Sequence, residues 1–114
     1  MFRGQIIHGD GIGKMTGYPT ANLDISAEAV CLDDGVYAAW VTLDKNKHSA
    51  ALVIQKSVGK VEAHVLDLVA NDLYGQEMQV EPVERVSGIE MLTGDDLINK
   101  ITQDIRAVRD VLGV

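Results

Sequence analysis

The sequence predicts a mainly β fold of the α+β class, a small antiparallel barrel of about six strands with a C-terminal helix packed on it. Short runs of apolar and β-branched residues recur along the chain, and polar or glycine-rich turns separate them. Apolar residues at helical spacing occur only near the C-terminus. The 114 residues suffice for one hydrophobic core, so a single domain over residues 1–114 is expected.

The first strand is expected over residues 5–8, where β-prone residues precede a glycine-rich stretch. Three glycines between residues 9 and 13 exclude a regular element there and indicate a loop. Pro19 then favours extended geometry in the residue before it, so residues 18–23 are predicted to be the second strand. Residues 24–34 have no period and are interpreted as an irregular excursion or flap.

The middle of the chain reads as a hairpin followed by a further strand. Residues 36–43 and 49–54 are rich in β-branched and apolar side chains, and the polar residues 44–47 form the turn between them. Residues 61–68 alternate, which is typical of a strand with two different faces. One face carries Val61, Ala63 and Val65, and the other carries Glu62, His64 and Leu66.

Residues 77–86 alternate again and predict the last strand, in which Pro82 indicates a strand end or an edge position. The helix follows, with Thr93 as its N-cap and Gly113 at its end. Its apolar stripe consists of Leu97, Ile101, Ile105, Val108 and Leu112.

Charge and composition argue against some classes of binding partner. The chain has 10 Lys and Arg against 17 Asp and Glu, a net charge of −7, which disfavours a nucleic-acid partner. No apolar run is long enough for a membrane span and the N-terminus does not resemble a signal peptide, so no membrane partner and a cytoplasmic location are expected. The protein is expected to be a monomer. Cys31 has no cysteine partner and is interpreted as a small buried hydrophobe.

The glycine-rich loop has two interpretations. With little side-chain bulk, its backbone N–H groups can turn toward phosphate oxygens, and Lys14 supplies a cation. Gly9, Gly13 and Lys14 are therefore candidate nucleotide-binding residues. The alternative is a glycine-rich hairpin turn without a ligand, because the spacing does not match the P-loop pattern.

Thr20 and Asn22 are candidate metal and nucleotide contacts. They are two positions apart on an extended segment, so their side chains project to the same side. A hydroxyl and an amide oxygen suit a Mg²⁺ ion held mainly by nucleotide phosphates and water. In the alternative interpretation both side chains satisfy only local backbone groups.

Several motifs together carry a resemblance to a known family. They are spaced glycines with a basic residue before a Gly-aromatic-Pro-Thr-Ala-Asn-Leu core, a Glu-x-His strand that ends in Asp, an Asp-Leu-Tyr-Gly turn and a terminal helix. In this chain they fall at Gly4, Gly9, Gly13-Lys14 and residues 17–23, then at residues 61–67, 72–75 and 96–109. Their order and spacing resemble the riboflavin kinases over nearly the whole chain.

The resemblance implies a six-stranded Greek-key barrel that binds MgATP and riboflavin near its mouth. It implies that the γ-phosphoryl group moves to the 5′-hydroxyl of the ribityl chain, which gives FMN. By the same resemblance Glu62 is the general base, and Thr20 and Asn22 contact Mg²⁺ and the phosphates. The nucleotide loop is placed at Gly9, Gly13 and Lys14.

Other functions stay open. Alternation alone makes Glu62 a solvated outward residue, so its role rests on the motif, and His64 on the same face is left out of the chemistry. A stand-alone kinase is expected, because the barrel begins within a few residues of Met1. The connection at residues 55–60 is shorter than the family's usual loop, which favours a non-catalytic flavin- or nucleotide-binding module instead. A structural barrel that contacts another protein is the third hypothesis.

Overall fold

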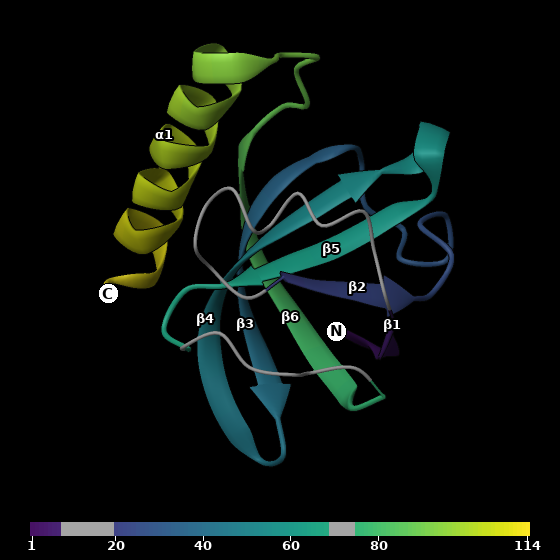
Figure 1. Cartoon of the computed structure of the whole chain (residues 1–114). Helices are drawn as coiled ribbons and strands as arrows, with labels where there is room; N and C mark the ends of the chain where they lie inside the picture. Colours follow the sequence, from purple (N-terminus) through teal and green to yellow (C-terminus); the bar gives the residue numbers. More distant parts are fainter. Residues whose placement is uncertain (8–19, 69–74) are drawn as a thin grey trace.

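The computed structural model describes residues 1–7, 20–68 and 75–114 of the chain. It contains six strands, a short 3-10 helix η2 and one α-helix (Figure 1). Their bounds are β1 (Phe2–Ile7), β2 (Thr20–Asp24), β3 (Gly35–Leu43), β4 (Asn46–Gln55), η2 (Lys56–Val58), β5 (Lys60–Val65), β6 (Glu77–Ser87) and α1 (Gly94–Leu112).

The strands form a closed barrel in the order β1-β2-β5-β4-β3-β6, and every pair is antiparallel. β3, β4 and β5 follow one another as neighbours, and β6 returns to lie beside β3, which is Greek-key connectivity. The predicted fold, a six-stranded antiparallel Greek-key barrel with a C-terminal helix, is confirmed.

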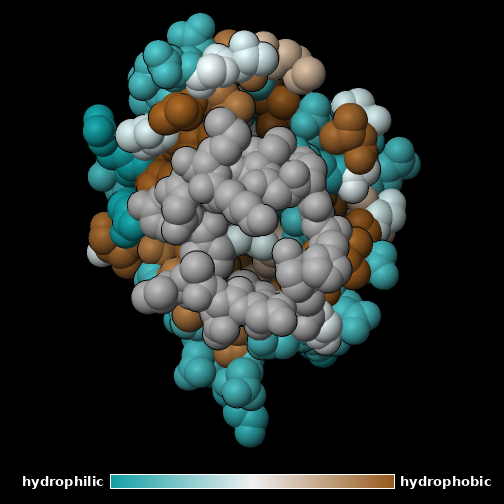
Figure 2. Space-filling model, viewed as in Figure 1, coloured by the Kyte–Doolittle hydropathy of each residue, from teal (hydrophilic) through white to brown (hydrophobic). Residues whose placement is uncertain are grey.

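The β3–β4 hairpin is longer than the sequence predicts. Only Asp44 and Lys45 form its turn, with φ angles of 45° and 69°, and the two residues after them already belong to β4. Two central residues with positive φ are the mark of a type I′ turn, whose twist suits a tight hairpin. The tip of this hairpin is a hydrophilic projection from the barrel (Figure 2).

Pro82 lies where β6 has a single neighbour. β1 begins at Phe2, opposite Val80, so the part of β6 from Pro82 onward pairs with β3 alone. The predicted edge position is therefore confirmed, but the strand does not end there and continues to Ser87. A register shift against β3 between Ala38 and Ala39 accompanies the proline.

One hydrophobic cluster fills the barrel interior, and the segment after β2 contributes to it. Ala27 is buried in this cluster, and Val30 and Leu32 pack against it, so the excursion predicted at residues 24–34 covers apolar core surface. The prediction that Cys31 is buried is wrong, because this residue has a φ of 61° in the turn and is exposed. Further members of the cluster are Ile6, Leu23, Val41, Leu52, Ile54, Val61, Val65, Met78 and Val80.

A second cluster lies outside the barrel, where α1 packs on the outer faces of β3, β4 and β6. Ala38 and Ala51 leave room for the helix, which buries Ile105 and Val108 against them. Thr93 and Gly113 bound α1 as predicted, although Thr93 makes no side-chain cap hydrogen bond. No helix within the described residues is long and apolar enough to cross a membrane.

Candidate functional site

A row of residues in register crosses the outer wall of the barrel. Asn22 on β2 pairs with Glu62 on β5, which also pairs with Val53 on β4. Val53 pairs with Val36 on β3, and Val36 pairs with Ser87 on β6. Directly opposed residues in antiparallel strands project to the same face. We call these five positions the outer row; its two ends are polar and its middle is apolar.

The neighbouring row contains Thr20 and His64, which also oppose each other across β2 and β5. His64 Nε2 lies 2.8 Å from Glu62 Oε1, and His64 Nδ1 lies 3.4 Å from Thr20 Oγ1. An ionised carboxylate can only accept, so the imidazole Nε2–H donates to Glu62, and in a neutral imidazole Nδ1 accepts from the Thr20 hydroxyl. The imidazole therefore links the hydroxyl on β2 to the carboxylate on β5.

Glu62 faces outward but is not solvated as alternation alone suggests. Only 2% of the residue is exposed, and His64 beside it is 7% exposed. The second oxygen, Oε2, is buried and has no hydrogen-bond partner within the described ranges. Burying a carboxylate with an unsatisfied oxygen is costly, and such groups cluster at functional sites. Glu62 is thus a candidate functional residue in the part of the chain that the structure describes.

A groove of about 160 Å³ lies between the outer wall and α1, and Glu62 and His64 line it. We call it the helix–barrel groove. Its floor is formed by Val36, Ala51 and Val53, and the helix supplies Leu97, Ile101 and Ile105. An apolar groove with a few polar groups is typical of a small-molecule site.

A second cavity, of about 210 Å³, is lined by Asn22 and by residues 58–61. Lys60 lines both this cavity and the helix–barrel groove. Asn22 and Glu62 are therefore neighbours that face two different spaces, and Lys60 is a cation common to both. This lysine was not among the residues predicted from sequence.

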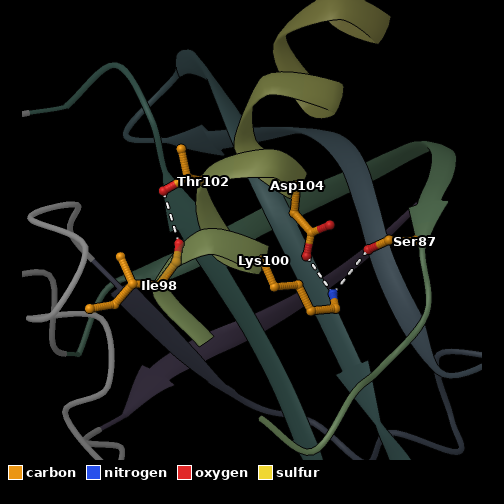
Figure 3. Close-up of polar contacts among 5 residues, drawn as sticks. All are labelled: Ser87, Ile98, Lys100, Thr102 and Asp104. Carbon is orange, nitrogen blue, oxygen red and sulfur yellow. Dashed lines mark hydrogen bonds and ion pairs between the residues drawn. The ribbon is translucent and has the colours of Figure 1, made fainter. Parts of the chain in front are cut away.

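The far end of the outer row carries an ion pair from the helix. Lys100 Nζ lies 2.6 Å from Asp104 Oδ2 and donates a hydrogen bond of 3.3 Å to Ser87 Oγ (Figure 3). The two charged side chains are only 14% and 13% exposed, and both residues line the groove. Figure 3 shows Thr102 pointing away from this network, with its hydroxyl bonded to the Ile98 carbonyl on its own helix.

Among the predicted site residues, the structure brings together Thr20, Asn22 and Glu62 on one face of the wall. The predicted nucleotide-loop residues Gly9, Gly13 and Lys14 lie outside the described residues. Sequence reasoning missed His64, although its spacing of two from Glu62 placed it on the same face. In the part of the chain that the structure describes, no group of three or more His, Cys, Asp or Glu side chains could hold a metal ion.

The fold and the site define a small β-barrel domain with a buried carboxylate–imidazole pair beside cavities on its outer wall. The family model described as "Flavokinase: Riboflavin kinase" matches residues 1–112. The chain belongs to the riboflavin kinase family.

Individual relatives agree with this assignment. A bifunctional riboflavin kinase/FMN adenylyltransferase from Escherichia coli K12 is 31% identical, with 97% of this chain and 37% of that protein covered. The chain thus spans little more than a third of the length of the curated relatives it matches.

Two solved structures share the fold. A riboflavin kinase from Trypanosoma brucei superposes with a TM-score of 0.74 at 21% identity and covers 97% of this chain and 78% of that one. A Streptococcus pneumoniae structure described as a macrolide-efflux protein also has a TM-score of 0.74, at 28% identity, and covers 94% of this chain and 35% of that chain.

Proposed function

We propose that this chain is a riboflavin kinase that transfers the γ-phosphoryl group of MgATP to the 5′-hydroxyl of riboflavin and gives FMN and ADP. The observation that carries the proposal is the buried Oε2 of Glu62, which has no hydrogen-bond partner among the described residues and belongs to a side chain that lines the helix–barrel groove. Membership of the riboflavin kinase family supports the same reaction.

Glu62 acts as the general base. Its Oε2 accepts the proton of the 5′-hydroxyl as that oxygen forms a bond to the γ-phosphorus, and the bond from this phosphorus to the β,γ-bridging oxygen breaks. ADP leaves with the bonding electron pair, and the proton stays on the carboxyl until product release. Phosphoryl transfer depends mainly on positioning and charge neutralisation, to which a base adds about 10²–10⁴-fold.

The donor side lies around Asn22 and Thr20. Their amide and hydroxyl oxygens are the neutral, hard ligands that suit Mg²⁺, and this ion would neutralise charge on the transferred phosphoryl group when bound. A chain with a net charge of −7 also needs cations near the triphosphate, and we assign Lys14 and the loop glycines Gly9 and Gly13 to that task.

The acceptor side is the helix–barrel groove. Its apolar floor, Val36, Ala51 and Val53, offers a surface for an aromatic ring system. Glu62 lies at one edge of that floor because it directly follows Val53 in the outer row. A flavin lying along the row would bring its ribityl hydroxyl to the carboxylate.

The test is direct. The purified chain is incubated with riboflavin, ATP and Mg²⁺, and FMN is measured by chromatography. FMN formation that requires all three supports the proposal, and the absence of FMN refutes it.

A non-catalytic flavin- or nucleotide-binding module is the second candidate. The observation that favours it is the tight connection from β4 to β5, which consists of η2 and Gly59. In that case riboflavin fluorescence would be quenched saturably, but no FMN would form. A structural barrel would give neither signal.

A further inference from the structure

We propose that Lys60 is a further catalytic residue of the kinase reaction, and that its ammonium group binds the γ-phosphoryl group while this group passes from ATP to the acceptor hydroxyl. The inference rests on the proposed function, because it takes Glu62 as the base and the cavity lined by Asn22 as the donor side. It adds the cation that neutralises negative charge where the donor side meets the acceptor side.

β5 carries three polar side chains in succession on its outer face. Lys60, Glu62 and His64 alternate with apolar residues that fill the barrel interior. Residues two positions apart on a strand lie about 7 Å apart on the same face. Lys60 therefore lies on one side of Glu62 and His64 on the other. The distance from Lys60 to Glu62 is one that a four-carbon side chain can span.

The two spaces of the candidate site have Lys60 in common. This residue lines both the helix–barrel groove and the cavity lined by Asn22. β2 and β5 lie side by side (Figure 1), and their pairing ends at Asn22 and Glu62. Lys60 and Val61 line the cavity just beyond that pair. A phosphoryl group that leaves a nucleotide in the cavity and reaches a hydroxyl in the groove therefore passes the lysine.

The lining of these spaces holds few cations. Among the described residues that line the cavity, Lys60 is the only charged one. The other lysine of the groove is Lys100, whose ammonium group lies 2.6 Å from Asp104 Oδ2. Lys100 also bonds to Ser87, at the opposite end of the outer row from Glu62. A triphosphate that approaches a chain of net charge −7 needs a cation near the base, and Lys60 occupies that position.

The backbone at Lys60 is well defined. η2 and Gly59 make the connection from β4, and the Gly59 N–H donates a 3.1 Å hydrogen bond to the Lys56 carbonyl. Gly59 has a φ of 62°, and Lys60 then pairs with Gln55 at the start of β5. This short connection fixes the main chain, while the flexible side chain can follow a phosphoryl group during transfer.

An ammonium group suits this position because phosphoryl transfer depends on charge neutralisation. The transferred group carries its negative charge on three non-bridging oxygens, and positioned cations stabilise the transition state. The Lys60 ammonium can donate N–H bonds to these oxygens. It gains and loses no proton in the step, since the proton of the acceptor hydroxyl goes to Glu62.

The experiment compares three variants. Lys60→Met removes the charge and keeps the length of the side chain, and Lys60→Arg keeps the charge. The control is Lys56→Met, the same charge change in the same connection, at an exposed residue that lines neither space. Steady-state FMN formation gives kcat, calorimetric titration gives the affinities for MgATP and MgADP, and fluorescence quenching gives the affinity for riboflavin.

We expect Lys60→Met to stay folded by circular dichroism and to lower kcat about tenfold or more. MgATP binding should weaken about tenfold, and MgADP binding should be unchanged, because ADP lacks the γ-phosphoryl group. Riboflavin affinity should also be unchanged. Lys60→Arg should recover part of both losses, and Lys56→Met should behave like the unmodified chain.

Two results would overturn the inference and leave the proposed function intact. One is an unmodified chain that makes FMN together with a Lys60→Met variant that matches Lys56→Met in kcat and MgATP affinity. The other is an equal loss of MgATP and MgADP affinity, which would place Lys60 on a part of the nucleotide that both share. An unmodified chain that makes no FMN would instead refute the proposed function, and the inference would fall with it.

Discussion

Asn22 and Glu62 lie directly opposite each other across the β2–β5 ladder, so a neutral amide and a buried carboxylate share one face of the barrel. The two residues are 40 positions apart in the chain, and only closure of the barrel brings them together. The pairing places Asn22, the candidate contact to Mg²⁺ and the phosphates, one strand spacing of about 4.8 Å from Glu62, the candidate base. In-line transfer between two bound molecules needs this kind of proximity.

The first prediction concerns the base. Glu62→Gln keeps the shape of the side chain but removes the proton acceptor, so we expect kcat for FMN formation to fall by about 10²–10⁴-fold. ATP binding should change little, because the amide still fills its place beside Asn22. Steady-state kinetics and a nucleotide titration check both parts. Glu84→Gln, an exposed change on β6, is the control; normal turnover in the Glu62 variant would remove this residue from the mechanism.

The second prediction makes His64 a positioning residue for Glu62. Its Nε2 lies 2.8 Å from Oε1, and this contact restricts the orientation of the carboxyl group. We expect His64→Ala to lower kcat about tenfold or more with little change in the KM for ATP or for riboflavin. The Glu62 carboxylate is still present in this variant, but the contact with His64 no longer fixes its orientation. His64→Gln, which retains a donor, should recover part of the loss. His48→Ala is the control, because His48 makes a similar contact of 2.7 Å with Asp67 on the hairpin side of the barrel. A purely structural role would lower stability and leave kcat of the folded fraction unchanged.

The third prediction concerns Lys14 in the glycine-rich loop. If this lysine contacts phosphate oxygens, Lys14→Ala should weaken ATP binding about tenfold and leave riboflavin binding nearly unchanged. Separate titrations of the two ligands measure the difference. Equal losses for both ligands would make Lys14 a surface residue without a phosphate contact.

The fourth prediction is a pH dependence of stability. Burial raises the pKa of Tyr37 above its usual 10.0, the nearby Arg85 opposes this, and the carboxylates of Asp33 and Asp34 add to it. A phenol whose pKa is raised in the folded state binds its proton more tightly in the native protein. Its contribution to the free energy of unfolding is therefore fully present below the pKa of the unfolded state and is lost as the pH rises through the pKa of the folded state.

Urea unfolding between about pH 9 and about pH 11 tests this dependence. The unmodified chain should lose stability more steeply than Tyr37→Phe in that range. At neutral pH the variant should be about 1 kcal/mol less stable, because the Tyr37 hydroxyl donates a 2.7 Å hydrogen bond to the Asp33 carbonyl. Parallel slopes for the two proteins would contradict the assignment.

Local periodicity predicted most of the fold, because each strand and the helix carry their own pattern. The alternation of residues 61–68 separated the face with Val61, Ala63 and Val65 from the face with Glu62 and His64, and both faces are as predicted. Cys31 was mispredicted because hydrophobicity does not report backbone conformation, and a φ of 61° turns this residue outward.

The candidate site was only partly accessible from sequence. The spacing of Thr20 and Asn22 on an extended segment made them candidates, and the family resemblance added Glu62, but the burial of Glu62 depends on strands and a helix that are distant in the chain. Lys100 and Asp104 read as an ordinary i,i+4 pair on a helix surface. Their place over Ser87, at the end of the outer row, follows from how α1 docks on the barrel, which no local pattern encodes.

The last prediction tests the helix–barrel groove as the acceptor site. Val53 lies between Glu62 and Val36 in the outer row and lines the groove floor. Phenylalanine at this position would occupy space that the flavin ring needs, while the cavity beside Asn22, which Val53 does not line, would be untouched. Val53→Phe should therefore weaken riboflavin binding about tenfold or more and leave ATP binding unchanged. Val83→Phe, at a half-exposed position on β6, controls for the added ring. If Val53→Phe binds riboflavin as well as this control does, the flavin lies elsewhere on the barrel.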